Sequence, residues 1–381
     1  MAPKIDTGKR EPKVTLKTIA ERVGLAIGTV SAALNDSPAA RVIPEQTKQR
    51  ILEVARELKY RPNYFARSLR LQRTYSIGVI TEQIGDPYGA MIISGIEDAL
   101  RGTEYLFLTV VHRHDQKVLK NYTEMLISRG VEGFITIDTS LLEEPSLPTI
   151  AIAGHTQVRG VTNLILDQKL AARLALTHLL DLGHRDIAFM KGQPTSSDSA
   201  SRWAAITSAC EELNIRMRPE LIVQIQRDLA TPQLGYPYAK ELLERNIPFT
   251  ALFAYNDLSA VGALWALREA GLRVPTDVSV IGFDDVQLAG YSDPPLTTIR
   301  QPLERMGHLA ARSLIDRIEN RAEYQSEIMI EPELVIRTST SPPALQVLGH
   351  TERSLPIPPI DFRETPTTDS PTAQRKRPIG V

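Results

Sequence analysis

Between residues 76 and 340 the chain alternates short apolar segments with amphipathic ones. The apolar segments include "SIGVI", "YLFLTVV" and "VSVIGF", and the segments between them repeat apolar residues at helical spacing, as in "VLKNYTEMLISRG". Strands that alternate with helices form parallel sheets covered by those helices. The sequence therefore predicts an α/β fold with parallel sheets for most of the chain.

Upstream of this region the sequence predicts a small all-α domain. Ala20, Gly24 and Val30 have the spacing of a helix-turn-helix, in which a small residue allows a close helix crossing, a glycine makes the turn and an aliphatic residue locks the second helix. The spacing alone is also compatible with an ordinary helical hairpin. The helical patterns cover residues 16–23, which follow a possible Thr15 cap, 27–34 and 45–60.

Charge is divided unevenly along the chain. Residues 1–73 hold 15 basic and 7 acidic side chains, a balance of +8, whereas the remaining residues hold 29 basic and 38 acidic ones, a balance of −9. Lysines and arginines gathered in one domain favour contact with a polyanion such as DNA, because they release counterions from its phosphates. An ordinary solvated surface is the alternative.

Several classes of protein are disfavoured by composition. The single cysteine, Cys210, cannot form an intrachain disulfide, and no run of about 18 apolar residues predicts a membrane span. No apolar segment of a signal peptide follows the basic N-terminus, so we expect a cytoplasmic protein. Beyond Thr340 the chain contains eight prolines and no apolar periodicity, which predicts a disordered tail.

Long motifs in a fixed order extend these expectations. "VTLKTIAERVGLAIGTVSAALND" closely resembles the N-terminal module of the lactose/galactose repressor (LacI/GalR) family, and motifs such as "LALTHLLDLGHRDIAFM", "IGFDD" and "PPLTTIRQP" follow in the family's order over residues 14–343. The resemblance implies a bacterial, sequence-specific transcriptional regulator, usually a repressor. Such a regulator binds a pseudo-palindromic operator as a homodimer and answers to a small molecule.

The resemblance implies a headpiece, a hinge and a two-lobed body, and together with the composition of the two ends it divides the chain into five parts. We expect a flexible arm at 1–13, a helix-turn-helix domain at 14–61, a hinge helix and linker at 62–75, a two-lobed effector and dimerisation domain of periplasmic-binding-protein type at 76–343, and a disordered tail at 344–381.

DNA contacts are expected from the second helix of the headpiece and from the hinge. The second helix departs from the family at Ala32, where an arginine is frequent, and Ile27 and Gly28 carry no base-reading polar group. In the family a hinge leucine enters the minor groove, and Leu69 occupies that position. The expected DNA-binding residues are Thr15, Ile27, Gly28, Thr29, Ser31, Asn35, Asn63, Ala66 and Leu69.

Ligand contacts are expected in the crevice between the lobes, where polar residues end the strands. "TEQIGDPYGAMI" is expected to place Glu82, Asp86 and Tyr88 at the mouth of the crevice, which suits a sugar, although a nucleobase would also stack on the tyrosine. We expect a wet crevice, from which Arg202 or Asp284 can be removed without unfolding the chain. The expected effector-binding residues are Tyr88, Asp167, Arg202, Asn256 and Asp284.

Catalysis has no visible carrier in the sequence. No nucleophile elbow, P-loop or dinucleotide glycine pattern occurs. His112 and His114 lack cysteines or carboxylates at metal-ligand spacing, so no metal site and no cofactor are expected. The alternative function is a solute-binding or sugar-processing protein with the same two-lobed body. The headpiece and the missing signal peptide argue against it.

Overall fold

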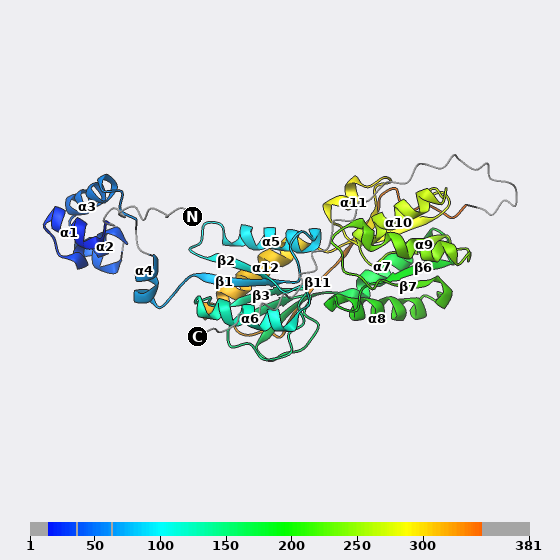
Figure 1. Ribbon diagram of the computed structural model, residues 1–381, viewed down its shortest axis with the longest axis horizontal. Coiled ribbons are helices and arrows are strands. Elements are labelled where there is room, and N and C mark those ends of the chain that lie inside the picture. Colours follow the sequence, from blue (N-terminus) through cyan, green and yellow to red (C-terminus); the bar gives the residue numbers. More distant parts are fainter. Residues whose placement is uncertain (1–13, 36, 62–63, 345–381) are drawn as a thin grey trace, which may run out of the picture. The chain divides into compact units, whose positions relative to one another are not determined.

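A computed structural model describes residues 14–35, 37–61 and 64–344. These residues form two compact units, and the boundary between the units lies between Thr74 and Tyr75 (Figure 1). The predicted arm at 1–13 and the tail from residue 345 onward lie outside the described residues. Within the described parts of the chain, no helix is both long and apolar enough to cross a membrane.

The N-terminal unit is a small helical domain with its own core. Ile19, Val30 and Ile51 come from three different helices, and each has 0% of its surface exposed. Because these side chains meet only when the three helices pack together, the core sets the angle at which the second helix is held. The elements are α1 (Leu16–Val23), α2 (Ile27–Leu34), the 3₁₀ helix η1 (Pro38–Val42), α3 (Glu45–Glu57) and α4 (Tyr64–Leu71).

Local chemistry defines both ends of α1. The Thr15 hydroxyl accepts a hydrogen bond from the backbone N–H of Thr18 at 3.3 Å, and the backbone N–H of Thr15 donates to the Thr18 hydroxyl at 3.2 Å. Gly24 ends the helix at φ 70°, a left-handed conformation that favours glycine. The predicted cap and the predicted glycine turn are both confirmed.

The first lobe of the larger unit is built on a six-stranded, all-parallel sheet in the order β11-β5-β4-β3-β1-β2. The last helix among the described residues, α12, packs beside α5 on this sheet (Figure 1). The elements are β1 (Ser76–Thr81), α5 (Pro87–Leu100), β2 (Leu106–Val111), α6 (Gln116–Ser128), β3 (Phe134–Ile137), β4 (Thr149–Ile152), β5 (Val161–Leu166), α12 (Leu303–Ile318) and β11 (Glu327–Ile330).

The second lobe has a sheet of the same size in the order β12-β10-β9-β8-β6-β7. The predicted parallel arrangement is confirmed, except that β12 runs antiparallel to β10. The elements are α7 (Gln168–Asp181), β6 (Ile187–Lys191), α8 (Ser197–Glu212), η2 (Pro219–Leu221), β7 (Ile222–Gln224), η3 (Pro232–Leu234), α9 (Tyr236–Glu244), β8 (Ala251–Phe253), α10 (Asp257–Glu269), β9 (Ser279–Asp284), α11 (Gln287–Tyr291), β10 (Thr297–Arg300) and β12 (Glu333–Val335).

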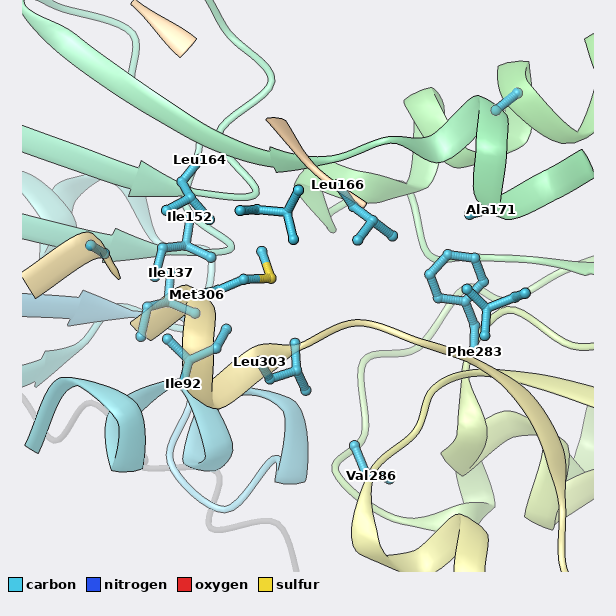
Figure 2. Close-up of a cluster of buried hydrophobic side chains, with 14 of the residues drawn as sticks. Ile92, Ile137, Ile152, Leu164, Leu166, Ala171, Phe283, Val286, Leu303 and Met306 are labelled. Atoms are coloured by element: carbon cyan, nitrogen blue, oxygen red, sulfur yellow. The ribbon is translucent and has the colours of Figure 1, made fainter. Parts of the chain in front are cut away.

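The chain passes between the lobes after β5, between β10 and α12, and between β11 and β12. Buried side chains join the two lobes at these crossings. Leu166, Leu303 and Met306 belong to the same apolar cluster as Phe283 of the second lobe (Figure 2). Each of the three crossings begins or ends in this apolar cluster, so the cluster holds the two sheets together. The polar residues at the ends of the strands face each other next to the cluster.

Candidate functional site

A narrow cleft between the lobes has a cavity volume of about 40 Å³, measured as the space open to the centre of a water molecule. It lies at the carboxyl ends of the parallel strands, where open α/β sheets commonly bind ligands. Its walls are strongly acidic, and Arg202 is the one arginine or lysine among the lining residues that the structure describes. The acidic lining residues are Glu82, Asp86, Asp138, Asp198, Asp228 and Asp284.

Arg202, on α8, is the deepest cation of the cleft, with 3% of its surface exposed. Its guanidinium donates to the carbonyl oxygen of Tyr255 at 2.8 Å, to Asp198 at 3.2 Å and to Gln168 at 3.4 Å. It also stacks 3.7 Å from the ring centre of Phe283. The expected wet environment is therefore wrong for this residue, because the protein itself surrounds it and uses its donors.

Asp284 ends β9 with 5% of its surface exposed, 3.9 Å from Arg202. Its carboxylate accepts a 2.7 Å hydrogen bond from the Gln301 amide. Burial raises the pKa of Asp284 to about 7, although Arg202 and Gln301 lower it. Its φ of 107° is rare for a residue with a side chain, and such strain gathers at functional sites. The neighbouring Asp285 instead pairs with Arg300 at 2.7 Å.

Hydrogen bonds cross from one lobe to the other at the floor of the cleft. Asp138, after β3, accepts from the backbone N–H of Ser197 at 2.7 Å and from its hydroxyl at 2.6 Å. His155, which follows β4, bonds to the Asp198 carboxylate. Burial acts to raise the pKa of Asp198, but the hydrogen bond from His155 and the charge of Arg202 outweigh burial and hold this pKa below its usual value. These bonds hold the lobes together.

At the mouth of the cleft His114 connects the lobes. Its Nε2 atom lies 2.8 Å from the Asp228 carboxylate of the second lobe and 3.3 Å from the Glu82 carboxylate of the first. Burial and the charge of Asp228 raise the pKa of Glu82 to about 9, and burial raises the pKa of Asp86 to about 6. Carboxyl groups are therefore crowded at this mouth with little positive charge to balance them.

Two buried polar atoms of the cleft have no hydrogen-bond partner among the described residues. They are the hydroxyl of Tyr88 and the amide oxygen Oε1 of Gln193. An unsatisfied buried polar atom costs about 1–3 kcal/mol. Both atoms therefore favour a polar ligand that supplies the missing partners.

Asn256 lines the cleft, but its side chain also has a structural task. Its Oδ1 atom accepts from the backbone N–H of Ser259 at 2.9 Å and caps α10. The next residue, Asp257, is 1% exposed, and its carboxylate accepts from the backbone N–H of Val286 at 2.9 Å and from the Thr298 hydroxyl at 2.6 Å. Burial raises the pKa of Asp257 well above its usual value.

Asp167 does not line the cleft. It caps α7 by accepting from the backbone N–H of Leu170 at 2.9 Å, and it lines a separate surface depression with Lys169 and Arg173. The structure thus brings four of the five predicted effector-binding residues together. The carboxylates of Asp138, Asp198 and Asp228 and the His155 imidazole were missed. Asp138 directly follows the apolar segment "FITI", which is the pattern that drew attention to Asp284.

The predicted DNA-binding residues of the headpiece lie on one continuous segment of α1 and α2. Ile27 is 47% exposed, and Thr15, Gly28 and Asn35 are exposed as well, whereas Thr29 and Ser31 are half-buried. Asn35 donates from its side chain to the carbonyl oxygen of Ser31 at 2.7 Å.

Ala32, which stands where an arginine is frequent in the family, is a buried core residue. Ala32 is 8% exposed and packs with Ala40 and Ile43.

The predicted hinge coincides with α4. Leu69 lies on this helix with 82% of its surface exposed. Ala66 lies within the helix backbone. Asn63 lies outside the described residues.

Comparisons with known proteins agree with this architecture. Residues 15–63 match the model of bacterial regulatory proteins of the lacI family, and residues 176–340 match that of a periplasmic binding protein-like domain. The chain is 34% identical over 333 residues to the HTH-type transcriptional repressor PurR of Mannheimia succiniciproducens, which covers 85% of this chain and 98% of the relative.

Two solved structures extend the likeness. The lac repressor dimer bound to operator and the anti-inducer ONPF matches 87% of this chain and 100% of its own, with 25% identity and a TM-score of 0.77. A LacI family regulator from Enterococcus faecium with bound ribose matches 70% of this chain and 99% of its own, with 28% identity and a TM-score of 0.62.

A helix-turn-helix headpiece and a two-lobed ligand-binding body define a DNA-binding transcriptional repressor under the control of a small-molecule effector. The chain belongs to the lacI family of bacterial regulatory proteins. These relatives confirm the prediction of a regulator rather than an enzyme, and the headpiece match favours it over a solute-binding protein.

Proposed function

We propose that the effector of this repressor is a polyhydroxylated, uncharged molecule of the carbohydrate class. The observation that carries the proposal is the lining of the cleft, which presents six carboxyl groups but only Arg202 as an arginine or lysine. Carboxylates accept hydrogen bonds from hydroxyl groups and repel anions. A hydroxyl also donates and accepts, so it can pair with the unpartnered hydroxyl of Tyr88. The ribose-bound relative supports this class of ligand.

A ligand panel tests the effector class on the full-length protein. Thermal-shift and calorimetric titrations with neutral mono- and disaccharides are compared with nucleobases and nucleosides, which the Tyr88 ring would also accommodate. A true effector raises the melting temperature by mass action. If a nucleobase binds and no sugar does, the carbohydrate class is wrong, whereas the assignment as a ligand-controlled repressor stands.

The variant Tyr88→Phe then tests the site. It removes a hydroxyl that has no partner among the described residues, so the free protein keeps its melting temperature. Effector affinity falls by about 2- to 12-fold, because one hydrogen bond of about 0.5–1.5 kcal/mol is lost. Tyr324→Phe is the control, since its hydroxyl donates to the carbonyl oxygen of Val161 at 3.0 Å outside the cleft. Unchanged affinity in Tyr88→Phe contradicts the site.

For DNA, we propose that α2 enters the major groove with Ile27 and Gly28 at the base edges. The nearby polar side chains contact phosphates or bases. The exposed Leu69 of α4 enters the minor groove between base steps. The polar contacts come from Thr15, Thr29, Ser31 and Asn35, and the hinge contacts include Asn63 and Ala66.

The active form in this proposal is a homodimer in the cytoplasm, associated with the nucleoid when it holds a pseudo-palindromic operator. Effector binding changes how far the lobes close, and this changes the orientation of the two first lobes in the dimer. The orientation then permits or prevents the packing of the hinge helices on DNA. Analytical ultracentrifugation of the full-length protein tests the dimer, and a monomer bound to operator would contradict it.

A further inference from the structure

Three metal-binding side chains converge at the mouth of the cleft from distant parts of the sequence. Glu82 follows β1, His114 follows β2, and Asp228 follows β7 of the other lobe. The Nε2 atom of His114 lies 3.3 Å from a Glu82 oxygen and 2.8 Å from an Asp228 oxygen, and all three donor atoms lie within 4.8 Å of one another. One imidazole nitrogen and two carboxylate oxygens thus face a common point.

The spacing suits a four-coordinate dication. Zinc binds imidazole nitrogen and carboxylate oxygen at about 2.0–2.2 Å, so the ligand atoms of a tetrahedral site lie about 3.3–3.5 Å apart. The 3.3 Å between His114 and Glu82 already has this value. The 2.8 Å between His114 and Asp228 must open by about 0.5 Å, which a small movement of one lobe provides. Three protein ligands leave the fourth position open.

Gln193 supplies a second, independent indication of a ligand. It is 6% exposed, and its amide nitrogen donates to the Asp228 carboxylate at 3.0 Å, which places the amide beside the cluster. Its Oε1 atom is buried and has no partner among the described residues. A metal ion, or a water molecule bound to one, would give this oxygen a partner.

Neighbouring groups hold the cluster but do not neutralise it. The Nδ1 atom of His112 accepts from the backbone N–H of His114 at 3.1 Å, and its Nε2 atom bonds to Thr139 at 2.9 Å, so neither ring nitrogen is free to bind metal. In the described part of the chain, no ion pair joins an arginine or lysine to Glu82 or Asp228. Two carboxylates therefore share one imidazole.

We propose that Glu82, His114 and Asp228 form a binding site for a transition-metal dication of the Zn²⁺ class, which ties the two lobes together at the mouth of the cleft. From the sequence we expected no metal site, because no carboxylate lies at metal-ligand spacing from His112 or His114. This proposal replaces that expectation, since the two carboxylate ligands follow other strands. The ligands belong to both lobes, so the bound metal stabilises the closed arrangement. By linkage, metal and effector strengthen each other's binding if the effector also needs closed lobes.

Calorimetry on the full-length protein, first treated with a chelator, tests the site with Zn²⁺ alone. We expect one saturable Zn²⁺ site per chain, and we expect His114→Ala to weaken it by at least tenfold. The control His308→Ala removes an imidazole that is half-exposed and pairs with Asp98 at 3.4 Å outside the cleft, and it leaves the affinity unchanged. Equal Zn²⁺ affinity in His114→Ala and the unaltered protein, or no saturable binding, overturns the proposal.

A second variant and a spectroscopic readout separate a lost ligand from a lost fold. Asp228→Asn keeps the shape of the side chain and an oxygen for the Gln193 amide, and it weakens Zn²⁺ at least tenfold while its far-ultraviolet circular dichroism stays unchanged. Co²⁺ in place of Zn²⁺ gives the intense visible bands of a four-coordinate site in the unaltered protein and in His308→Ala. The same bands in Asp228→Asn place the metal elsewhere and overturn the proposal. Because no effector is present, failure here leaves the carbohydrate assignment intact.

Discussion

Replacing Arg202 by methionine tests whether the deepest cation of the cleft is part of the fold. The guanidinium is 3% exposed and lies 3.2 Å from Asp198 and 3.9 Å from Asp284. Methionine fills much of the space but leaves two buried carboxylates without their cation. Breaking a buried ion pair in this way costs about 3–5 kcal/mol, a large part of the 5–15 kcal/mol that stabilises a typical protein.

The cost depends on pH in a defined direction. Burial already raises the pKa of Asp284 to about 7 in the folded protein, above the ordinary value of 3.8 for this side chain, so the folded state holds this proton more tightly than the unfolded state. The contribution of Asp284 to stability therefore falls as the pH rises towards about 7. Without Arg202, which lowers this pKa, the folded value rises further, and the loss of stability extends to higher pH. Arg202→Met is therefore more destabilising at about pH 8 than at about pH 6.

Urea unfolding followed by tryptophan fluorescence measures this effect, because both tryptophans, Trp203 and Trp265, lie in the second lobe. Asp284→Asn added to Arg202→Met recovers part of the loss at the higher pH. Arg218→Met is the control, since its pair with Asp186 at 3.2 Å is partly exposed, with side chains 30% and 54% accessible, and contributes about 0–1 kcal/mol. An equal loss at both pH values, with no recovery in the double variant, refutes the reasoning.

Four further changes have defined outcomes. Thr29→Ala combined with Ser31→Ala weakens operator binding in gel-shift titrations while effector affinity stays the same, and unaltered operator binding would refute the assignment of α2. Leu69→Ala lowers operator affinity much more than affinity for random DNA, and equal losses count against minor-groove insertion. Gly307→Ala lowers the free energy of unfolding by about 1–3 kcal/mol or more, because a Cβ there would lie 2.0 Å from a backbone oxygen of α5, and an unchanged midpoint in urea would contradict this packing. Deletion of residues 344–381 leaves the melting temperature nearly unchanged, and a large fall would show that the tail docks.

Local patterns in the sequence predict the headpiece almost completely. The Thr15 cap, the Gly24 turn and the buried Val30 depend on neighbours within a few residues, and helix propensity and capping act over that distance. The family resemblance adds four residues of the cleft. Tyr88 and Asn256 stand at the start of helices and Asp284 ends a strand, whereas Arg202 lies within α8 and was found from the family motif alone. Asp167 shows the limit of this reasoning, since the same local pattern also describes a helix cap.

The arrangement of the lobes cannot be read from local patterns. β11 and β12 are separated by two residues, yet they join different sheets, and only the packing of α12 on α5 explains why the chain returns to the first lobe. Burial is also a tertiary property, so the sequence could not show that Arg202 is enclosed by protein rather than by water.

By itself the sequence determined the α/β class, the helix-turn-helix and the family, because alternation, caps and motifs are encoded in nearby residues. Only the tertiary structure decided which polar side chains share the cleft. Glu82, His114 and Asp228 follow three strands that lie far apart in the chain, and they meet because the carboxyl ends of parallel strands in both sheets face each other across the junction between the lobes.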